Sequence, residues 1–163
     1  MERINTYEKW LEQEGLPVIK DYSVADLMAV PLKPWARKGA LGAYINLIGA
    51  EGVIDAYLCE IPPGGSVLPQ RHLYEELIYI LSGSGATTVW VEGSTKQSFE
   101  WHEGSLFSPP LNTWHQHLNR QGDKPVRYLG WCSPQATASL RPGNRLPGRI
   151  QGRPGAPNTG ETT

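Results

Sequence analysis

The 163-residue sequence lacks several features that would mark a membrane, secreted or nucleic-acid-binding protein. It contains no run of about 18 apolar residues, so no membrane-spanning helix is predicted. Its first residues lack the apolar stretch of a secretory signal, and we therefore expect a cytoplasmic protein. The 15 basic and 16 acidic side chains leave a net charge of -1, which provides no basic surface for nucleic acid or an anionic membrane. The partner we expect is a small-molecule substrate.

Cysteine is also scarce. Cys59 and Cys132 are the only two cysteines, and they lie far apart in the sequence without forming a CxxC pair. Their spacing argues against a disulfide framework and against a thiolate metal site. We interpret both as ordinary buried side chains.

Glycine and proline, by contrast, are frequent, with 18 and 14 residues. The turns that they form favour short strands over long helices. Runs of strand-like residues between these turns predict an all-β fold, a sandwich or a barrel, and the chain is long enough for one domain. The predicted strands are residues 43–48, 53–61, 76–81, 86–91, 96–101, 105–108, 115–119 and 126–131.

The two ends of the chain differ from this pattern. Asn5 and Glu8 form a capping pair for a short helix over residues 6–14, and Gly15 ends that helix. The C-terminal segment is rich in glycine, proline and arginine and has no aromatic residue, so we expect it to be a disordered tail. The predicted divisions are an N-terminal arm with a short helix, residues 1–39, a barrel, residues 40–132, and the tail, residues 133–163.

The predicted strand 76–81 is mostly apolar on both faces. One face carries Glu76, Ile78 and Ile80, and the other carries Leu77, Tyr79 and Leu81. A strand buried on both sides needs a second layer, supplied by the N-terminal segment or by another subunit. A homodimer is therefore predicted.

Three of the four histidines lie in two spaced patterns. Gln70 and His72 share one face of a strand, and a turn after His72 can return Glu76 to the same place. His115 and His117 also share a face. Buried imidazoles, a carboxylate and an amide oxygen need partners, and one divalent cation can satisfy them together. The sequence therefore predicts a metal site.

These two patterns resemble the motifs of the cupins, G-x5-H-x-H-x3-E-x6-G and G-x5-P-x-G-x2-H-x3-N. The matching residues are Gly64, His72, Glu76 and Gly83 in the first motif and Gly104, Pro110, His115 and Asn119 in the second. The resemblance implies a double-stranded β-helix, or jelly-roll, barrel that binds one divalent metal ion.

Two positions depart from the cupin pattern. Gln70 stands where the first histidine of the H-x-H pair belongs, and Asn112 replaces the glycine after Pro110. Asparagine tolerates a left-handed turn, so the second change is mild. The first leaves His72, Glu76 and His115, a set that is similar to the two-histidine, one-carboxylate arrangement of non-haem Fe(II) enzymes. Gln70 is then either a fourth ligand or a hydrogen-bonding group that orients a water at the metal.

Within the cupins, the segment from Pro109 to Asn119 resembles the gentisate and hydroxynaphthoate dioxygenases, in which a W-H-x-H-x-N segment recurs. This resemblance implies an Fe(II)-dependent dioxygenase acting on a small aromatic or carbonyl compound. The cupin motif takes only the first histidine of the pair at 115 and 117 as a ligand. We therefore expect His117 to face the substrate, with a catalytic role, or to lie behind a ligand. That group carries three histidine ligands and two cupin domains, so this chain is similar to an N-terminal half or a free-standing relative.

Two other readings stay open at the level of sequence. Zn(II), Ni(II) or Mn(II) bound by the same residues would act as a Lewis acid in a lyase or isomerase. A cupin module that only binds a ligand is the third possibility, which the glutamine at position 70 favours.

Several other residues have simpler interpretations. His102 is expected to be exposed, Trp114 to pack away from His115, and Asn119 to bond to backbone groups at the end of a strand. Arg37, Lys38 and Arg127 are candidates for holding a substrate carboxylate, although exposed ion pairs are their more common role.

Overall fold

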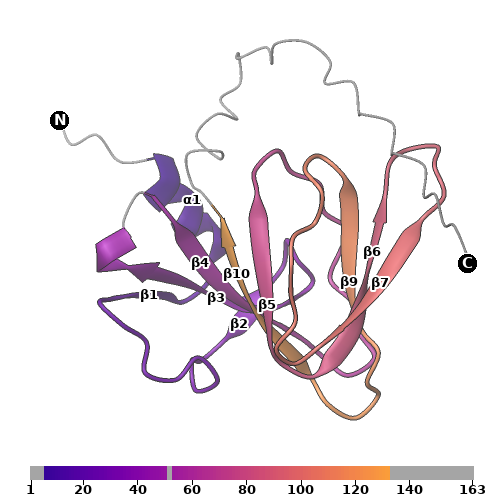
Figure 1. The fold of residues 1–163 in the computed structure, drawn as a ribbon. Helices are drawn as coiled ribbons and strands as arrows, with labels where there is room; N and C mark the ends of the chain where they lie inside the picture. Colours follow the sequence, from indigo (N-terminus) through magenta and orange to yellow (C-terminus); the bar gives the residue numbers. More distant parts are fainter. Residues whose placement is uncertain (1–5, 51–52, 133–163) are drawn as a thin grey trace, which may run out of the picture.

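Two β-sheets face each other in a computed structural model that describes residues 6–50 and 53–132 (Figure 1). The larger sheet has seven strands in the order β1-β3-β4-β10-β5-β8, with β2 paired to β3, and the smaller sheet has the order β7-β6-β9. Together the sheets form the jelly-roll barrel that the motifs predict. The strands of the larger sheet are β1 (Val18–Asp21), β2 (Lys33–Trp35), β3 (Ala40–Leu47), β4 (Asp55–Ile61), β5 (Glu76–Ser82), β8 (Leu106–Phe107) and β10 (Val126–Cys132), and those of the smaller sheet are β6 (Ser84–Trp90), β7 (Gln97–His102) and β9 (Trp114–Asn119).

Strand β10 lies at the centre of the larger sheet, between β4 and β5, and pairs antiparallel with both. The segment after β4 joins the smaller sheet, because the backbones of Gln70 and His115 exchange two hydrogen bonds of 2.9 Å. The core between the sheets contains Ile78, Ile80 and Tyr128, all at most 1% exposed. Burying side chains of this size contributes about 1.5–3 kcal/mol each.

All eight predicted strands are present, with ends shifted by a few residues. The predicted helix is also present as α1 (Thr6–Glu14), followed by Gly15 at a φ of 66°. The capping role of Asn5 and the tail over residues 133–163 lie outside the described residues. Strands β1 and β2 were not predicted. Both are short and mostly exposed and lack alternating apolar residues, so their pairing with β3 depends on tertiary contacts.

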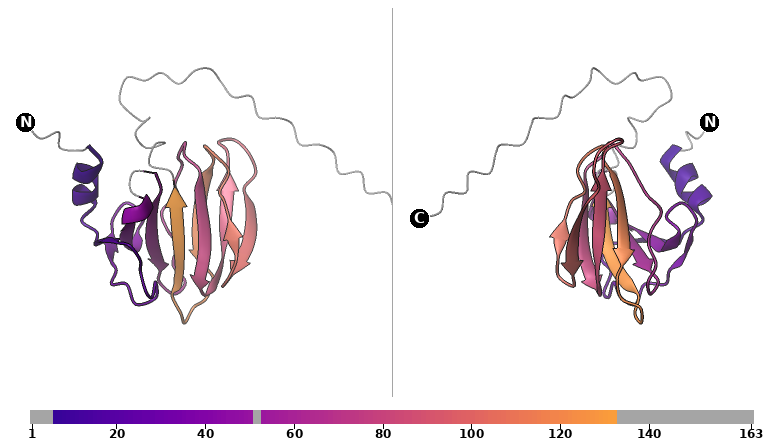
Figure 2. Two further views of the ribbon diagram at one scale, coloured as in Figure 1. Left: turned by 60° about the vertical axis from the view of Figure 1, so that its left-hand side comes forward. Right: turned by 90° about the vertical axis from the view of Figure 1, so that its right-hand side faces the viewer.

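The N-terminal segment packs against the larger sheet, and Figure 2 shows it on the side of the barrel away from β6 and β7. Glu14 at the end of α1 accepts hydrogen bonds from the indole of Trp35, from Nε of Arg37 at 3.0 Å and from the hydroxyl of Tyr44 at 3.3 Å. The Arg37 guanidinium lies over the rings of Trp10 and Trp35, 5.4 and 5.1 Å from their centroids. One carboxylate therefore links α1 to β2 and β3.

The two faces of β5 differ within the single chain. Glu76, Ile78 and Ile80 point inward and are at most 1% exposed, but Leu77 and Tyr79 on the other face are 39% and 38% exposed. The N-terminal segment packs over β3 and β4 instead, where Val30 contacts a small second cluster. A second subunit over the outer face of β5 stays a prediction.

Among the described residues, no helix is long and apolar enough to cross a membrane.

The Glu14 contacts lead to a stability prediction. Glu14→Ala removes an acceptor of three hydrogen bonds, including charged ones, and is expected to lower the free energy of unfolding by about 1–3 kcal/mol. Glu12→Ala is the matched control, because Glu12 lies on the same helix and is exposed. Urea denaturation of both variants measures the difference. Equal stability of the two variants would contradict the role of Glu14 in docking α1.

Candidate metal centre

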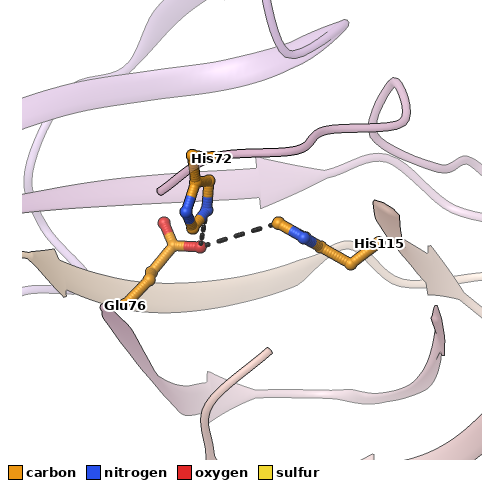
Figure 3. Close-up of side chains that lie close together, drawn as sticks. All are labelled: His72, Glu76 and His115. Atoms are coloured by element: carbon orange, nitrogen blue, oxygen red, sulfur yellow. Dashed lines mark hydrogen bonds and ion pairs between the residues drawn. The ribbon is translucent and has the colours of Figure 1, made fainter. Parts of the chain in front are cut away.

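Three side chains from distant parts of the sequence meet inside the barrel. His72 lies in the loop before β5, Glu76 is the first residue of β5, and His115 is the second residue of β9. One potential ligand atom from each lies within 4.8 Å of the other two. Figure 3 shows both imidazoles directed at the Glu76 carboxylate. The structure therefore brings together the three residues that the sequence predicts as the metal cage, and we use that name for them below.

Backbone carbonyls determine which nitrogen carries the hydrogen in the neutral form of each imidazole ring. Nδ1 of His72 lies 2.9 Å from the carbonyl oxygen of Tyr74, and Nδ1 of His115 lies 3.1 Å from that of Thr113. A carbonyl only accepts, so each Nδ1 donates its hydrogen to it. Each neutral ring then has an unprotonated Nε2, the form that binds a metal.

The Nε2 atoms of both rings face the same carboxylate oxygen. Oε2 of Glu76 lies 3.1 Å from Nε2 of His72 and 3.8 Å from Nε2 of His115. The shorter contact is a hydrogen bond, whereas Nε2 of His115 is buried without a hydrogen-bond partner. One proton could bridge His72 and Glu76, but it would leave His115 unsatisfied. A single cation satisfies all three, so the residues present fit a divalent metal ion.

The other oxygen of Glu76 is held by a residue of the same sheet and by one from the segment between β2 and β3. The Tyr57 hydroxyl donates a hydrogen bond to Oε1, and Nζ of Lys38 lies 3.9 Å from the same atom. Burial alone would raise the pKa of the Glu76 carboxyl, but the charge of Lys38 and the hydrogen bonds from His72 and Tyr57 outweigh it and hold the pKa well below its usual range. Glu76 is therefore an anion inside the barrel.

His117 lies next to the cage but has a different partner. Its Nδ1 is 2.8 Å from Oγ1 of Thr87, and this hydroxyl already accepts a hydrogen bond of 2.9 Å from the indole of Trp101. A hydroxyl oxygen has two lone pairs, so Thr87 can donate its hydrogen to Nδ1 or accept one from it. The Nε2 atom of His117 is buried and has no partner among the described residues. His117 therefore presents an unpartnered ring nitrogen beside the cage.

Gln70 lies beside His115 through the paired backbone bonds between the two residues. The Nε2 atom of its side chain is buried without a hydrogen-bond partner. This unpartnered amide nitrogen lies in the segment next to the cage. Its role as a ligand or as an orienting group stays a prediction.

The remaining candidates occupy the places expected from the sequence. His102 is exposed and bonds to Ser105, whereas the Asn119 amide donates to the carbonyls of Ile61, Pro62 and Lys124 at a strand end. Trp114 stacks on Trp90 and lies away from the cage.

Asn112 adopts a φ of 57°, the left-handed conformation that glycine supplies elsewhere in the family. Its backbone N–H donates to the carbonyl oxygen of His72 at 2.9 Å, so the loop before β9 supports a cage residue.

Of the three candidates for a substrate carboxylate, both arginines are used in ion pairs. Arg37 pairs with Glu14, and Arg127 pairs with Glu60 at 2.8 Å. Lys38 alone lies at the cage. An open hollow of about 400 Å3 lies elsewhere on the barrel and includes no cage residue; it is lined by Gly39, Ala40, Leu41, Glu60, Pro62, Pro63 and Pro125.

Tyr57, Thr87 and Trp101 lie outside the two sequence motifs. Tyr57 alternates inward with Cys59 along β4, and this period of two was the only signal available. Nothing in the sequence indicated that Tyr57 would contact Glu76 or that Thr87 would contact both His117 and Trp101.

Comparison with known proteins agrees with this geometry. The family model described as the cupin domain matches residues 57–132. The barrel is a cupin domain. The matched residues include all three members of the cage.

The cupin domain also has similar relatives with described activities. The 5-aminosalicylate 1,2-dioxygenase of a Comamonas species is 27% identical over 124 residues, which cover 69% of this chain and 32% of that protein. The oxalate decarboxylase of Lactobacillus farciminis superposes with a TM-score of 0.54 at 22% identity, covering 65% of this chain and 31% of the other. That of Bacillus subtilis superposes with a TM-score of 0.53 at 21% identity, covering 61% and 27%. The chain thus spans about a third of the length of these proteins, and the two decarboxylases support the fold alone.

Two buried histidines make the stability of the metal-free cupin domain depend on pH. Burial lowers the pKa of His115 to about 4 and, with the neighbouring His115, that of His117 to about 3. An unfolded histidine has a pKa of about 6.5, so below that pH the unfolded chain binds protons that the native state does not. The free energy of unfolding is therefore expected to fall as pH decreases from about 7 to about 5, with a slope of up to about 1.4 kcal/mol per pH unit for each histidine.

Urea denaturation of the metal-free protein at several pH values measures this slope. His117→Asn should reduce the slope, whereas His102→Asn should not, because His102 is exposed. Glu76 does not contribute in this window, since its lowered pKa affects stability only below the usual pKa of a carboxyl group. A free energy of unfolding that is constant across the window would contradict the burial of neutral histidines.

Proposed function

We propose that the cupin domain binds one divalent metal ion through His72, Glu76 and His115 and acts as a non-haem Fe(II)-dependent dioxygenase on a small aromatic or carbonyl compound. The observation that carries the proposal is the convergence of two imidazole Nε2 atoms on one carboxylate oxygen. The similarity to 5-aminosalicylate 1,2-dioxygenase supports ring-cleaving chemistry. Two histidines and one carboxylate leave coordination positions open for a substrate and oxygen, as in non-haem Fe(II) oxygenases.

The ion, when bound, supplies the electron transfer to dioxygen and the polarisation of the substrate that side chains alone do not provide. The protein holds the ligands in place. The carbonyls of Tyr74 and Thr113 fix the two rings, and Tyr57 fixes the outer oxygen of Glu76. Burial of the cage excludes bulk water, which strengthens electrostatic interactions at the site.

His117 lies in a position to contact the substrate. When Thr87 donates to Nδ1, the hydrogen of the neutral ring lies on Nε2, from where it can donate to an oxygen atom of a bound ligand. We propose this donation as its catalytic role. Gln70 supplies an amide group for orienting a ligand or a water, or an oxygen for the metal itself.

Metal analysis tests the cage directly. His72→Ala and Glu76→Gln each remove one proposed ligand. Loss of a residue that only orients a ligand weakens metal binding by about 10- to 100-fold, and we expect these two variants to weaken Fe(II) binding by more than that. His102→Ala is the matched control, since His102 is an exposed histidine outside the cage. Metal content after anaerobic reconstitution should be about one ion per chain in the wild type and the control. An unchanged content in both cage variants would contradict the ligand assignment.

Oxygen consumption tests the reaction. After anaerobic loading with Fe(II), the protein is expected to take up oxygen with at least one member of a panel of hydroxylated aromatic acids that includes 5-aminosalicylate. The zinc-loaded protein should not, because Zn(II) does not change oxidation state. An oxygen electrode and product analysis measure the result. Conversion of substrate by the zinc form without oxygen uptake would instead support a lyase or isomerase.

One contact favours a second candidate, a ligand-binding module without catalysis. The Lys38 ammonium balances the charge of Glu76 in the described structure, so the barrel tolerates this carboxylate without an added cation. A wild-type protein that binds aromatic acids but no metal would support this function.

A further inference from the structure

The sequence places Lys38 outside both cupin motifs, yet its side chain enters the barrel. It is only 3% exposed, and Nζ donates a hydrogen bond of 3.1 Å to the Tyr57 hydroxyl. The ammonium also lies over the rings of Tyr57 and Trp35, 4.3 and 5.2 Å from their centroids. A buried cation needs a counter-charge, and its ion-pair partner in the described structure is Oε1 of Glu76.

A bound metal would leave an excess of positive charge at the cage. Without a metal, the charges of the Lys38 ammonium and the Glu76 carboxylate balance each other. Imidazoles bind a metal in their neutral form, so a divalent ion would add its two positive charges to a pair that is already balanced. Unbalanced charge in a buried site is costly, and a neutral ligand does not reduce it.

We propose that Lys38 makes the metal and an anionic ligand bind cooperatively, so that the loaded cage prefers a ligand with a negatively charged oxygen, such as a carboxylate, over a neutral ligand of the same shape. This inference rests on the proposed metal binding. The preference for an anion then comes from Lys38, which lies in the N-terminal segment and outside both cupin motifs.

The contacts of Lys38 allow this role. An ammonium has three hydrogens, and among the described residues Nζ has one hydrogen bond to Tyr57 and a longer contact of 3.9 Å to Glu76. It therefore keeps donor capacity for a ligand oxygen. Even without direct contact, its charge lies next to the carboxylate that neutralises the metal, so Lys38 competes with the metal for Glu76. An added anion relieves that competition.

Co(II) affinity measured by titration calorimetry tests the proposal without any catalytic assay. Acetate and acetamide serve as an anionic and a neutral ligand of nearly equal shape, at constant ionic strength and after correction for the weak complex of free Co(II) with acetate. For the wild type, acetate is expected to tighten Co(II) binding by about tenfold, within the usual range of coupling between sites. Acetamide should change the affinity less than about twofold.

Variants of Lys38 test whether its charge causes the effect of acetate on Co(II) affinity. Lys38→Met removes the charge and is expected to bind Co(II) about tenfold more tightly without acetate and to lose most of the acetate effect. Lys38→Gln repeats the test with a polar side chain in case the first variant folds poorly. Lys38→Arg keeps the charge and should keep the acetate effect.

The outcomes separate this inference from the proposed function. Equal effects of acetate and acetamide on the wild type, or a full acetate effect in both uncharged variants, would overturn the role of Lys38 while leaving the metal site intact. Weaker Co(II) binding in both uncharged variants would show that Lys38 only supports Glu76, and would overturn the inference as well. Absence of Co(II) binding that depends on His72 would overturn the proposed function together with the inference.

Discussion

The buried carboxylate of Glu76 is the constraint on which the rest of the site depends. It is an anion in an interior where an unpaired charge is unstable, so every group around it either donates to it or balances its charge. Its two oxygens have different surroundings. Oε1 faces Tyr57 and Lys38, and Oε2 faces the two imidazoles. Because Tyr57 and Lys38 hold one oxygen, the carboxylate presents the other to the histidines in a fixed orientation.

The three interior histidines differ in the partner of Nδ1. His72 and His115 bond to backbone carbonyls, whereas His117 bonds to the hydroxyl of Thr87. That hydroxyl also accepts a hydrogen bond from the indole of Trp101. The same residue type therefore has two kinds of surroundings in the interior, without any difference that the sequence itself displays.

The limits of the sequence follow from the range of the contacts involved. Alternation of side chains predicted eight strands, because it depends on residues a few positions apart. The two motifs predicted the cage, because the resemblance to the cupins links segments that lie far apart in the sequence. They did not predict β1, whose pairing with β3 is parallel and connects distant segments. They also left Lys38 as one of three equivalent cations, since only the folded chain shows that Arg37 and Arg127 pair with acids elsewhere. Apolar residues such as Leu77 and Tyr79 also occur on exposed surfaces, so the sequence of β5 does not show whether its outer face is covered.

Gln70 and Lys38 differ in what they bring to the site. Glutamine and neutral histidine carry the same charge, so Gln70 leaves the charge beside the cage unchanged. Lys38 adds a positive charge next to Glu76. The two residues lie in separate segments, one paired with β9 and the other following β2. Under the proposed metal binding, a weaker donor at position 70 and a cation at position 38 would both reduce the hold of the protein on the ion, and a chelating anion would compensate for both at once.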